Sequence, residues 1–438
     1  MGKKKEKREI LAMGNLEKLK EEIKKALEHQ KQVILQGPPG SGKTYLAKEI
    51  AQNILATSEQ KLYWKLVAKY LEKHWKAFVN YMVDRKYTSN KISPQEFFSK
   101  KSFTKNGEEL IVLSNEEDGK DYISFSIKHF KIILQILEKY SIEIENISNI
   151  RSLNKIFGVS SIDDETLKDI TKWLLNYLKN WLEKEKEFNE LLSSEKLKLK
   201  ALIQFHPSYT YEDFVRGIQI KIENGHPKYE TVNKIFAELC EEALNNPDLK
   251  YVLIIDEINR ANLPAVLGEL IYALEYRGEP VETPYEINGN KTLIVPENLY
   301  IIGTMNTADR SIGHIDYAVR RRFFFITIKA NKELIENPKA KELYEETIEK
   351  IFKEENMSPE FKDKVEDVKI GHTYFLGENE EKIAYKFVYQ VIPLLVEYIQ
   401  DGILKGEEVV KGVFENYFGG IKDWKTLTVE DVLRKLKP

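Results

Sequence analysis

The residues best suited to chemistry form one short run near the N-terminus, GPPGSGKT, where three glycines precede a lysine and a threonine. This spacing is typical of a loop whose backbone N–H groups surround phosphate oxygens. In such a loop the lysine neutralises the β- and γ-phosphates and the hydroxyl ligates Mg²⁺. We therefore predict that a nucleoside triphosphate is bound by Gly37, Pro38, Pro39, Gly40, Ser41, Gly42, Lys43 and Thr44. The alternative is a glycine-rich turn with an incidental lysine.

A second motif supports the first. The apolar run YVLIID ends on Asp256 and is followed directly by Glu257. Buried parallel strands have this composition, and ligands bind beyond their carboxyl ends. We predict that Asp256 holds magnesium together with Thr44 and that Glu257 is the general base that polarises the attacking water. A strand followed by a solvated acidic turn is the alternative.

A third apolar run, at residues 299–304, leads into MNTADRS at residues 305–311. Asn306 at the end of a strand can contact the γ-phosphate or orient the water without titrating. The letters NTAD superficially match the N-K-x-D element with which small GTPases bind guanine, but Thr307 replaces the lysine. We therefore interpret Asn306 as a phosphate and water sensor and not as a base-binding residue.

Three consecutive arginines follow at Arg320, Arg321 and Arg322, just before an apolar run. One hypothesis is a structural surface cluster. The other is that, in a ring of subunits, one arginine reaches the γ-phosphate of a neighbouring subunit as an arginine finger.

The elements that must position these residues follow from length, composition and periodicity. The chain has 438 residues, of which 42% are hydrophobic, a net charge of −3 and one cysteine, Cys240. These values favour two or three packed domains and exclude global disorder and an internal disulfide framework. No apolar run approaches the roughly 20 residues of a membrane span, and the basic N-terminus lacks the apolar stretch of a signal peptide. We expect a soluble, cytoplasmic protein.

The predicted fold class is α/β, with a parallel sheet split by a long, mainly helical insertion and followed by a C-terminal helical lid. Short apolar runs predict the strands of this sheet, at residues 32–36, 200–205, 251–256, 299–306 and 323–328. Helical spacing predicts helices at about 16–29 and 43–55. We divide the chain into 1–57 (N-terminal helix and first part of the core), 58–199 (insertion), 200–330 (rest of the core) and 331–438 (lid).

Taken together, the motifs resemble those of an AAA+ module. The phosphate loop, DEINRAN at 256–262, MNTADRS and AVRRRF at 318–323 occur in the order of that P-loop NTPase core. Their wording resembles the GTPase subunit of McrBC-type, modification-dependent restriction systems, as do FHPSYTYEDFVRGI at 205–218 and GHTYF at 371–375. The similarity covers roughly residues 30–55 and 200–400, and the segment between them is unmatched.

The resemblance implies properties that composition does not show. It implies hydrolysis of GTP rather than ATP, a hexameric ring, and a McrC-type nuclease partner that stimulates hydrolysis and cuts DNA. Carried over by motif, Asn306 and Asp309 would position the hydrolytic water, and Arg321 or Arg322 would act in trans.

Two features depart from the family pattern. The short motif with a sensor arginine found in many AAA+ lids is not evident, and His372 of GHTYF lies in that region. A DNA-reading domain usually precedes the loop in this family, whereas 36 residues precede it here. We therefore expect recognition of a modified base to reside outside this chain.

The insertion contains a lysine stripe, which we define as Lys61, Lys65, Lys69, Lys73 and Lys76. These residues fall on one arc of a predicted helix, opposite Val67, Leu71, Trp75 and Phe78. One interpretation is that the stripe is a cationic face that binds DNA phosphates or the acidic surface of a partner. The other is that it is a solvated helix face. The tryptophans of the insertion, Trp64, Trp75, Trp173 and Trp181, are expected in its core.

Two other functions remain open from the sequence. One is an ATP-driven AAA+ remodelling chaperone of the MoxR or dynein-like branch. The other is a DNA-binding scaffold in which nucleotide serves only as an assembly switch, although a full set of Lys43, Asp256, Glu257 and Asn306 exceeds what a switch requires.

Overall fold

The computed structural model describes residues 2–84, 98–105, 108–115, 121–140, 164–309, 315–419 and 423–437. The chain divides into two compact units. The first contains residues 1–54, 200–247 and 251–438, and the second contains residues 55–199 and 248–250. Within the described residues no helix is both long and apolar enough to cross a membrane.

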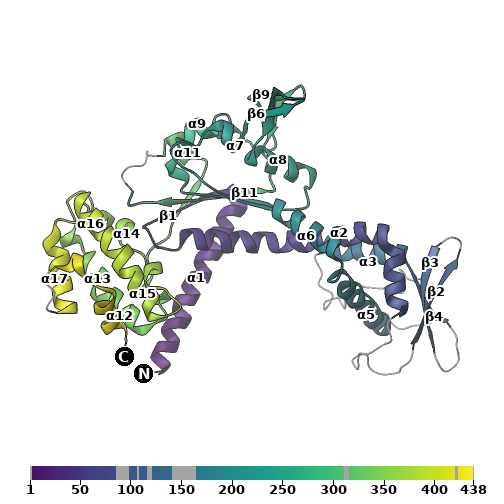
Figure 1. Ribbon diagram of the computed structural model, residues 1–438, viewed down its shortest axis with the longest axis horizontal. Helices are drawn as coiled ribbons and strands as arrows, with labels where there is room; N and C mark the ends of the chain where they lie inside the picture. Colours follow the sequence, from purple (N-terminus) through teal and green to yellow (C-terminus); the bar gives the residue numbers. More distant parts are fainter. Residues whose placement is uncertain are drawn as a thin grey trace. The chain divides into compact units, whose positions relative to one another are not determined.

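The first unit is built on a five-stranded parallel sheet (Figure 1). Its spatial order is β12 (Phe324–Thr327), β1 (Gln32–Gly37), β11 (Leu299–Asn306), β8 (Tyr251–Asp256) and β5 (Lys200–Gln204). The predicted strands are therefore confirmed. Strands β1, β8 and β11 are almost fully buried, as expected for a sheet whose two faces are covered by helices.

The helices around the sheet include α1 (Gly2–Gln30), α8 (Ile235–Asn245) and α2, which begins at Lys43 directly after the phosphate loop. Helix α2 runs from Lys43 to Asp84, so it starts in the first unit and continues into the second. The predicted helix at 43–55 is its first part.

Two antiparallel hairpins that the sequence analysis did not predict extend the first unit. One pairs β6 (Arg216–Glu223) with β7 (His226–Asn233), and the other pairs β9 (Pro280–Ile287) with β10 (Asn290–Ile294). Arg216 is buried, and its guanidinium donates to Asn233 Oδ1, Thr283 Oγ1 and the Thr292 carbonyl. This one side chain therefore ties the two hairpins together.

The lid follows β12 and has a hydrophobic core of its own (Figure 1, green to yellow). Its main helices are α12 (Pro338–Glu346), α15 (Glu380–Lys386), α16 (Ile392–Gln400), α17 (Glu407–Phe418) and α18 (Val429–Leu436). A short 3₁₀ turn, η6 (His372–Phe375), precedes α15. The core includes Tyr344, Phe375, Phe387, Phe414 and Trp424.

The second unit contains most of α2 together with α3 (Ile127–Tyr140), α5 (Asp164–Leu182) and α6 (Lys186–Lys198). It also contains a three-stranded antiparallel sheet of β2 (Phe98–Lys105), β3 (Glu108–Asn115) and β4 (Asp121–Ser126), which the sequence analysis did not predict. Its short strands FSKKSFTK and DYISFS carry polar residues throughout, so periodicity alone did not distinguish them from the surrounding charged segments.

The core of the second unit is aromatic. Trp64, Trp75 and Trp181 are buried, as predicted, while the side chain of Trp173 lies outside the described residues. The lysine stripe lies on the arc of α2 opposite its buried face. Its Lys65, Lys69, Lys73 and Lys76 are exposed, and its Lys61 is half-buried.

Candidate functional site

The order of the strands brings the predicted site residues to one edge of the sheet. Strand β11 lies between β1 and β8, with Gly37 of β1 opposite Asn306 and Gly303 of β11 opposite Ile255. Asp256 and Glu257 follow Ile255 directly. Because all three strands are parallel, the phosphate loop, the acidic pair and the asparagine leave the sheet at the same end.

The phosphate loop connects β1 to α2 and has the backbone of an anion cradle. Gly42 has φ +86°, a conformation that side chains with a Cβ rarely adopt. Lys43 is buried, and its Nζ donates to the carbonyls of Gly37 (3.0 Å) and Pro38 (2.8 Å). Burial lowers the pKa of Lys43 to about 8. A phosphate in the cradle would favour the charged ammonium and raise that pKa again.

The Thr44 hydroxyl, at the start of α2, contacts the carboxylate of Asp256 at the end of β8. Thr44 Oγ1 donates to Asp256 Oδ1 at 2.7 Å, and the Thr304 hydroxyl donates to the same oxygen. Hydroxyl and carboxylate oxygens are the ligands that Mg²⁺ prefers, and it usually binds through one or two of them together with phosphates and waters. The pair of Thr44 and Asp256 therefore fits a magnesium ion that also contacts a phosphate.

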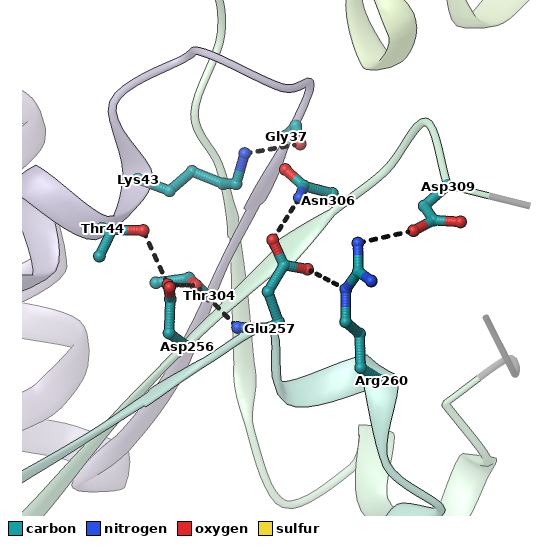
Figure 2. A network of polar contacts seen from close by, with 9 residues as sticks. All are labelled: Gly37, Lys43, Thr44, Asp256, Glu257, Arg260, Thr304, Asn306 and Asp309. Atoms are coloured by element: carbon teal, nitrogen blue, oxygen red, sulfur yellow. Dashed lines mark hydrogen bonds and ion pairs between the residues drawn. The ribbon is translucent and has the colours of Figure 1, made fainter. Parts of the chain in front are cut away.

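Glu257 stands at the centre of a second network, drawn in Figure 2. Asn306 Nδ2 donates to its Oε1, and Arg260 Nε donates to its Oε2 at 3.3 Å. The same guanidinium donates to Asp309 Oδ2 at 3.1 Å. Burial raises the pKa of Glu257, although Arg260 and Lys43 oppose that shift. A carboxylate held on both oxygens and with raised basicity is suited to accept a proton.

The backbone at Glu257 is strained. Its φ is +52°, a left-handed conformation that is uncommon for residues other than glycine. Such strain costs about 1–3 kcal/mol and concentrates at functional sites. Here it turns the chain sharply at the end of β8, and the Glu257 N–H donates to Thr304 Oγ1 at 3.3 Å.

The arginine run is not part of these networks, and its members differ in environment. Arg322 is buried, donates to the carbonyls of Ile271 (2.9 Å) and Ala318 (2.7 Å), and pairs with Glu275 at 2.6 Å. The Arg321 side chain is 66% exposed and lies 3.7 Å from the same glutamate. Arg322 therefore stabilises the fold of its own chain, whereas Arg321 can extend outward.

Sequence reasoning missed two participants, Thr304 and Arg260. Thr304 is a polar residue near the end of an otherwise apolar strand, two positions before Asn306. Arg260 lies three residues after Glu257 on a 3₁₀ turn (η2, Ile258–Arg260). Both residues stand beside a predicted site residue in the sequence. Their roles were missed because Thr304 bonds to Asp256, 48 residues away, and Arg260 bonds to Asp309, 49 residues away.

Comparisons with known proteins agree with this fold. Residues 186–323 match the AAA domain of the dynein-related subfamily, and residues 347–405 match the alpha-helical lid domain of McrB. Residues 17–86, which contain the phosphate loop, match a novel STAND NTPase family. The fold and the site thus define a P-loop NTPase of the AAA class with a helical lid.

Two curated relatives are more specific. The chain is 37% identical to the EcoKMcrB subunit of the type IV methyl-directed restriction enzyme of Escherichia coli K12 over 238 residues, which is 50% of this chain and 51% of that protein. It is 29% identical to the YdiS component of the type II restriction enzyme BsuMI of Bacillus subtilis over 166 residues, 30% of this chain and 48% of that protein. The chain is thus similar to McrB-type proteins over its AAA domain and its lid domain. It spans about half the length of the curated relatives it matches.

Proposed function

We propose that this chain is a GTP-hydrolysing motor subunit of a restriction system, working in the cytoplasm. The single observation that carries the hydrolytic part is the network around Glu257, in which a half-buried carboxylate is oriented on one oxygen by Asn306 and on the other by Arg260. A site that only binds nucleotide has no need for such a base.

The residues divide the work as follows. Lys43, which donates to the carbonyls of Gly37 and Pro38, would donate to the phosphates instead, and Thr44 and Asp256 would hold magnesium. Magnesium, when bound, neutralises charge on the phosphates. Glu257 accepts the proton of the attacking water. Asn306 keeps that carboxylate in position.

Arg260 and Asp309 belong to the hydrolytic site of the same subunit. The Arg260 guanidinium bridges the carboxylates of Glu257 and Asp309, so a movement at Asp309 changes the position of the base. Asp309 therefore acts on the water through Arg260 and Glu257. Arg321, the exposed member of the arginine run, supplies positive charge to a neighbour's γ-phosphate in a ring that we propose to be hexameric.

The choice of GTP over ATP rests on likeness to McrB-type proteins. The same likeness supports a McrC-type nuclease as partner and DNA as the target of the assembled complex. The EcoKMcrB relative is described as a subunit of a methyl-directed restriction enzyme, and the YdiS relative as a component of another restriction enzyme.

The test is turnover by the purified chain with GTP and with ATP, each with magnesium. We expect clear preference for GTP, and preference for ATP would instead favour a remodelling ATPase. Glu257→Gln should retain nucleotide binding and lose about 10²–10⁴-fold in turnover, the usual contribution of a general base. Glu286→Gln, an exposed glutamate on β9, is the matched control and should leave turnover unchanged. Equal turnover of both variants would remove Glu257 from the base role.

A further inference from the structure

One turn of the lid lies directly on the phosphate loop. We call residues 371–375 (GHTYF) the lid turn. The Gly371 N–H donates to the Pro39 carbonyl at 2.8 Å, and the Thr373 N–H donates to the Gly40 carbonyl at 3.0 Å. The Tyr374 ring covers Gly40 so closely that a Cβ on that glycine would come within 2.4 Å of it. The lid turn therefore forms one wall of the cradle.

His372 is the polar side chain of this wall. It is 5% exposed, and its Nδ1 accepts a hydrogen bond from the Asn331 N–H at 3.2 Å. Because Nδ1 is an acceptor, the proton of the neutral ring resides on Nε2. Nε2 lies 3.9 Å from the position that a Cβ on Gly42 would occupy. Among the described residues, nothing accepts a hydrogen bond from Nε2.

Because Nε2 has no acceptor among the described residues and is not one of the fully buried unpaired atoms, its N–H is free to bond to a ligand in the cradle. The hydrogen bond from the Asn331 N–H to Nδ1 fixes the orientation of the ring and therefore the position of this donor. The donor faces the part of the loop whose backbone N–H groups gather around phosphate oxygens. The missing acceptor therefore has the chemistry of a phosphate.

We propose that His372 Nε2–H donates a hydrogen bond to a phosphate oxygen of the bound nucleotide, so that the lid contacts the nucleotide directly through this residue. The inference rests on the proposed function, because it assumes that the cradle binds a nucleotide. Through His372 and the two backbone bonds of the lid turn, occupation of the cradle becomes linked to the position of the lid.

The electrostatics agree with this role. Burial lowers the pKa of His372 to about 4, so the ring is neutral at pH 7 and offers a single N–H. A phosphate placed beside Nε2 favours the imidazolium and raises that pKa. This response distinguishes a phosphate ligand from a packing residue, whose pKa would not change when nucleotide binds.

The first test measures the affinity of the full chain for GDP and for a non-hydrolysable GTP analogue. His372→Phe keeps a ring of similar size and removes the Nε2 donor together with the Nδ1 acceptor of the Asn331 N–H. We expect about tenfold weaker binding, the value of one hydrogen bond to a charged acceptor. Tyr389→Phe is the matched control, because it changes one polar atom on an exposed aromatic residue of the lid that lies outside the lid turn. It should bind within about twofold of the wild type.

The second test follows the His372 imidazole by NMR in histidine-labelled protein, with the signal assigned by its loss in His372→Phe. Addition of GDP should move the Nε2 resonance and raise the apparent pKa of the ring. Unchanged affinity of His372→Phe with an unmoved signal would overturn the proposal while leaving the GTPase function intact, provided that Lys43→Met still weakens binding. Absence of GTP and ATP binding by the wild type would overturn both.

Discussion

Gly371 is the position where the contact between the lid turn and the phosphate loop can be broken most cleanly. A Cβ at this residue would lie 2.0 Å from the carbonyl carbon and oxygen of Gly40 and 2.4 Å from the Ser41 nitrogen. These atoms belong to the backbone, so no change of rotamer relieves the overlap. Gly371→Ala must therefore push the lid turn and the loop apart.

The cost can be worked from the contacts. Overpacking of this kind costs about 1–3 kcal/mol. Separation also weakens the Gly371–Pro39 and Thr373–Gly40 backbone hydrogen bonds, worth about 0.5–1.5 kcal/mol each. Together these terms raise the free energy of the arrangement in which the lid turn contacts the phosphate loop by about 2–6 kcal/mol. If nucleotide binds to that arrangement, its affinity falls at least about 30-fold, the lower end of this range.

The assay is calorimetric titration of GDP into Gly371→Ala, with circular dichroism to verify the fold. Gly412→Ala in α17 is the matched control, because a Cβ there meets nothing within 4 Å. It removes a glycine from a helix, so it should leave affinity unchanged and stabilise the protein by about 0.5–1 kcal/mol. Wild-type affinity in Gly371→Ala would refute the close contact between lid turn and loop.

Four further predictions concern the site and the residues around it. Lys43→Met should weaken GTP binding by about 10–100-fold through loss of a charge-assisted contact, as measured by titration. Arg321→Ala should lose about 10³-fold in turnover and regain activity when mixed with Lys43→Met, whereas a lack of recovery would argue against action in trans. Arg322→Ala should instead lower the melting temperature, because Glu275 and two carbonyls lose their partner. For His372, the folded pKa of about 4 lies below the unfolded value of about 6.5, so the unfolded chain binds the proton more readily. Stability should therefore fall as the pH drops from about 6.5 to 4, and melts of His372→Gln should show a smaller loss.

Local spacing made a large part of the core predictable. The five strands of the central sheet are short apolar runs with clear ends, and the helix after the phosphate loop begins where the motif requires it. The hairpin β6–β7 was not predicted, although Ile218, Ile220 and Ile222 alternate with polar residues along β6; the structure shows that these three side chains are exposed. Alternation indicates a strand, but it does not reveal that the apolar face lacks a covering layer.

The phosphate loop, Asp256, Glu257 and Asn306 could be proposed as site residues from the sequence itself, because each depends on a few neighbouring residues whose types suit one chemistry. What only the tertiary structure decided are relations between distant segments. The position of β11 between β1 and β8 sets Asn306 beside Glu257. Packing buries Arg322 and exposes its neighbour. The lid turn meets a loop more than 300 residues earlier in the chain. Such contacts depend on how the elements pack, and no local pattern of residues encodes that.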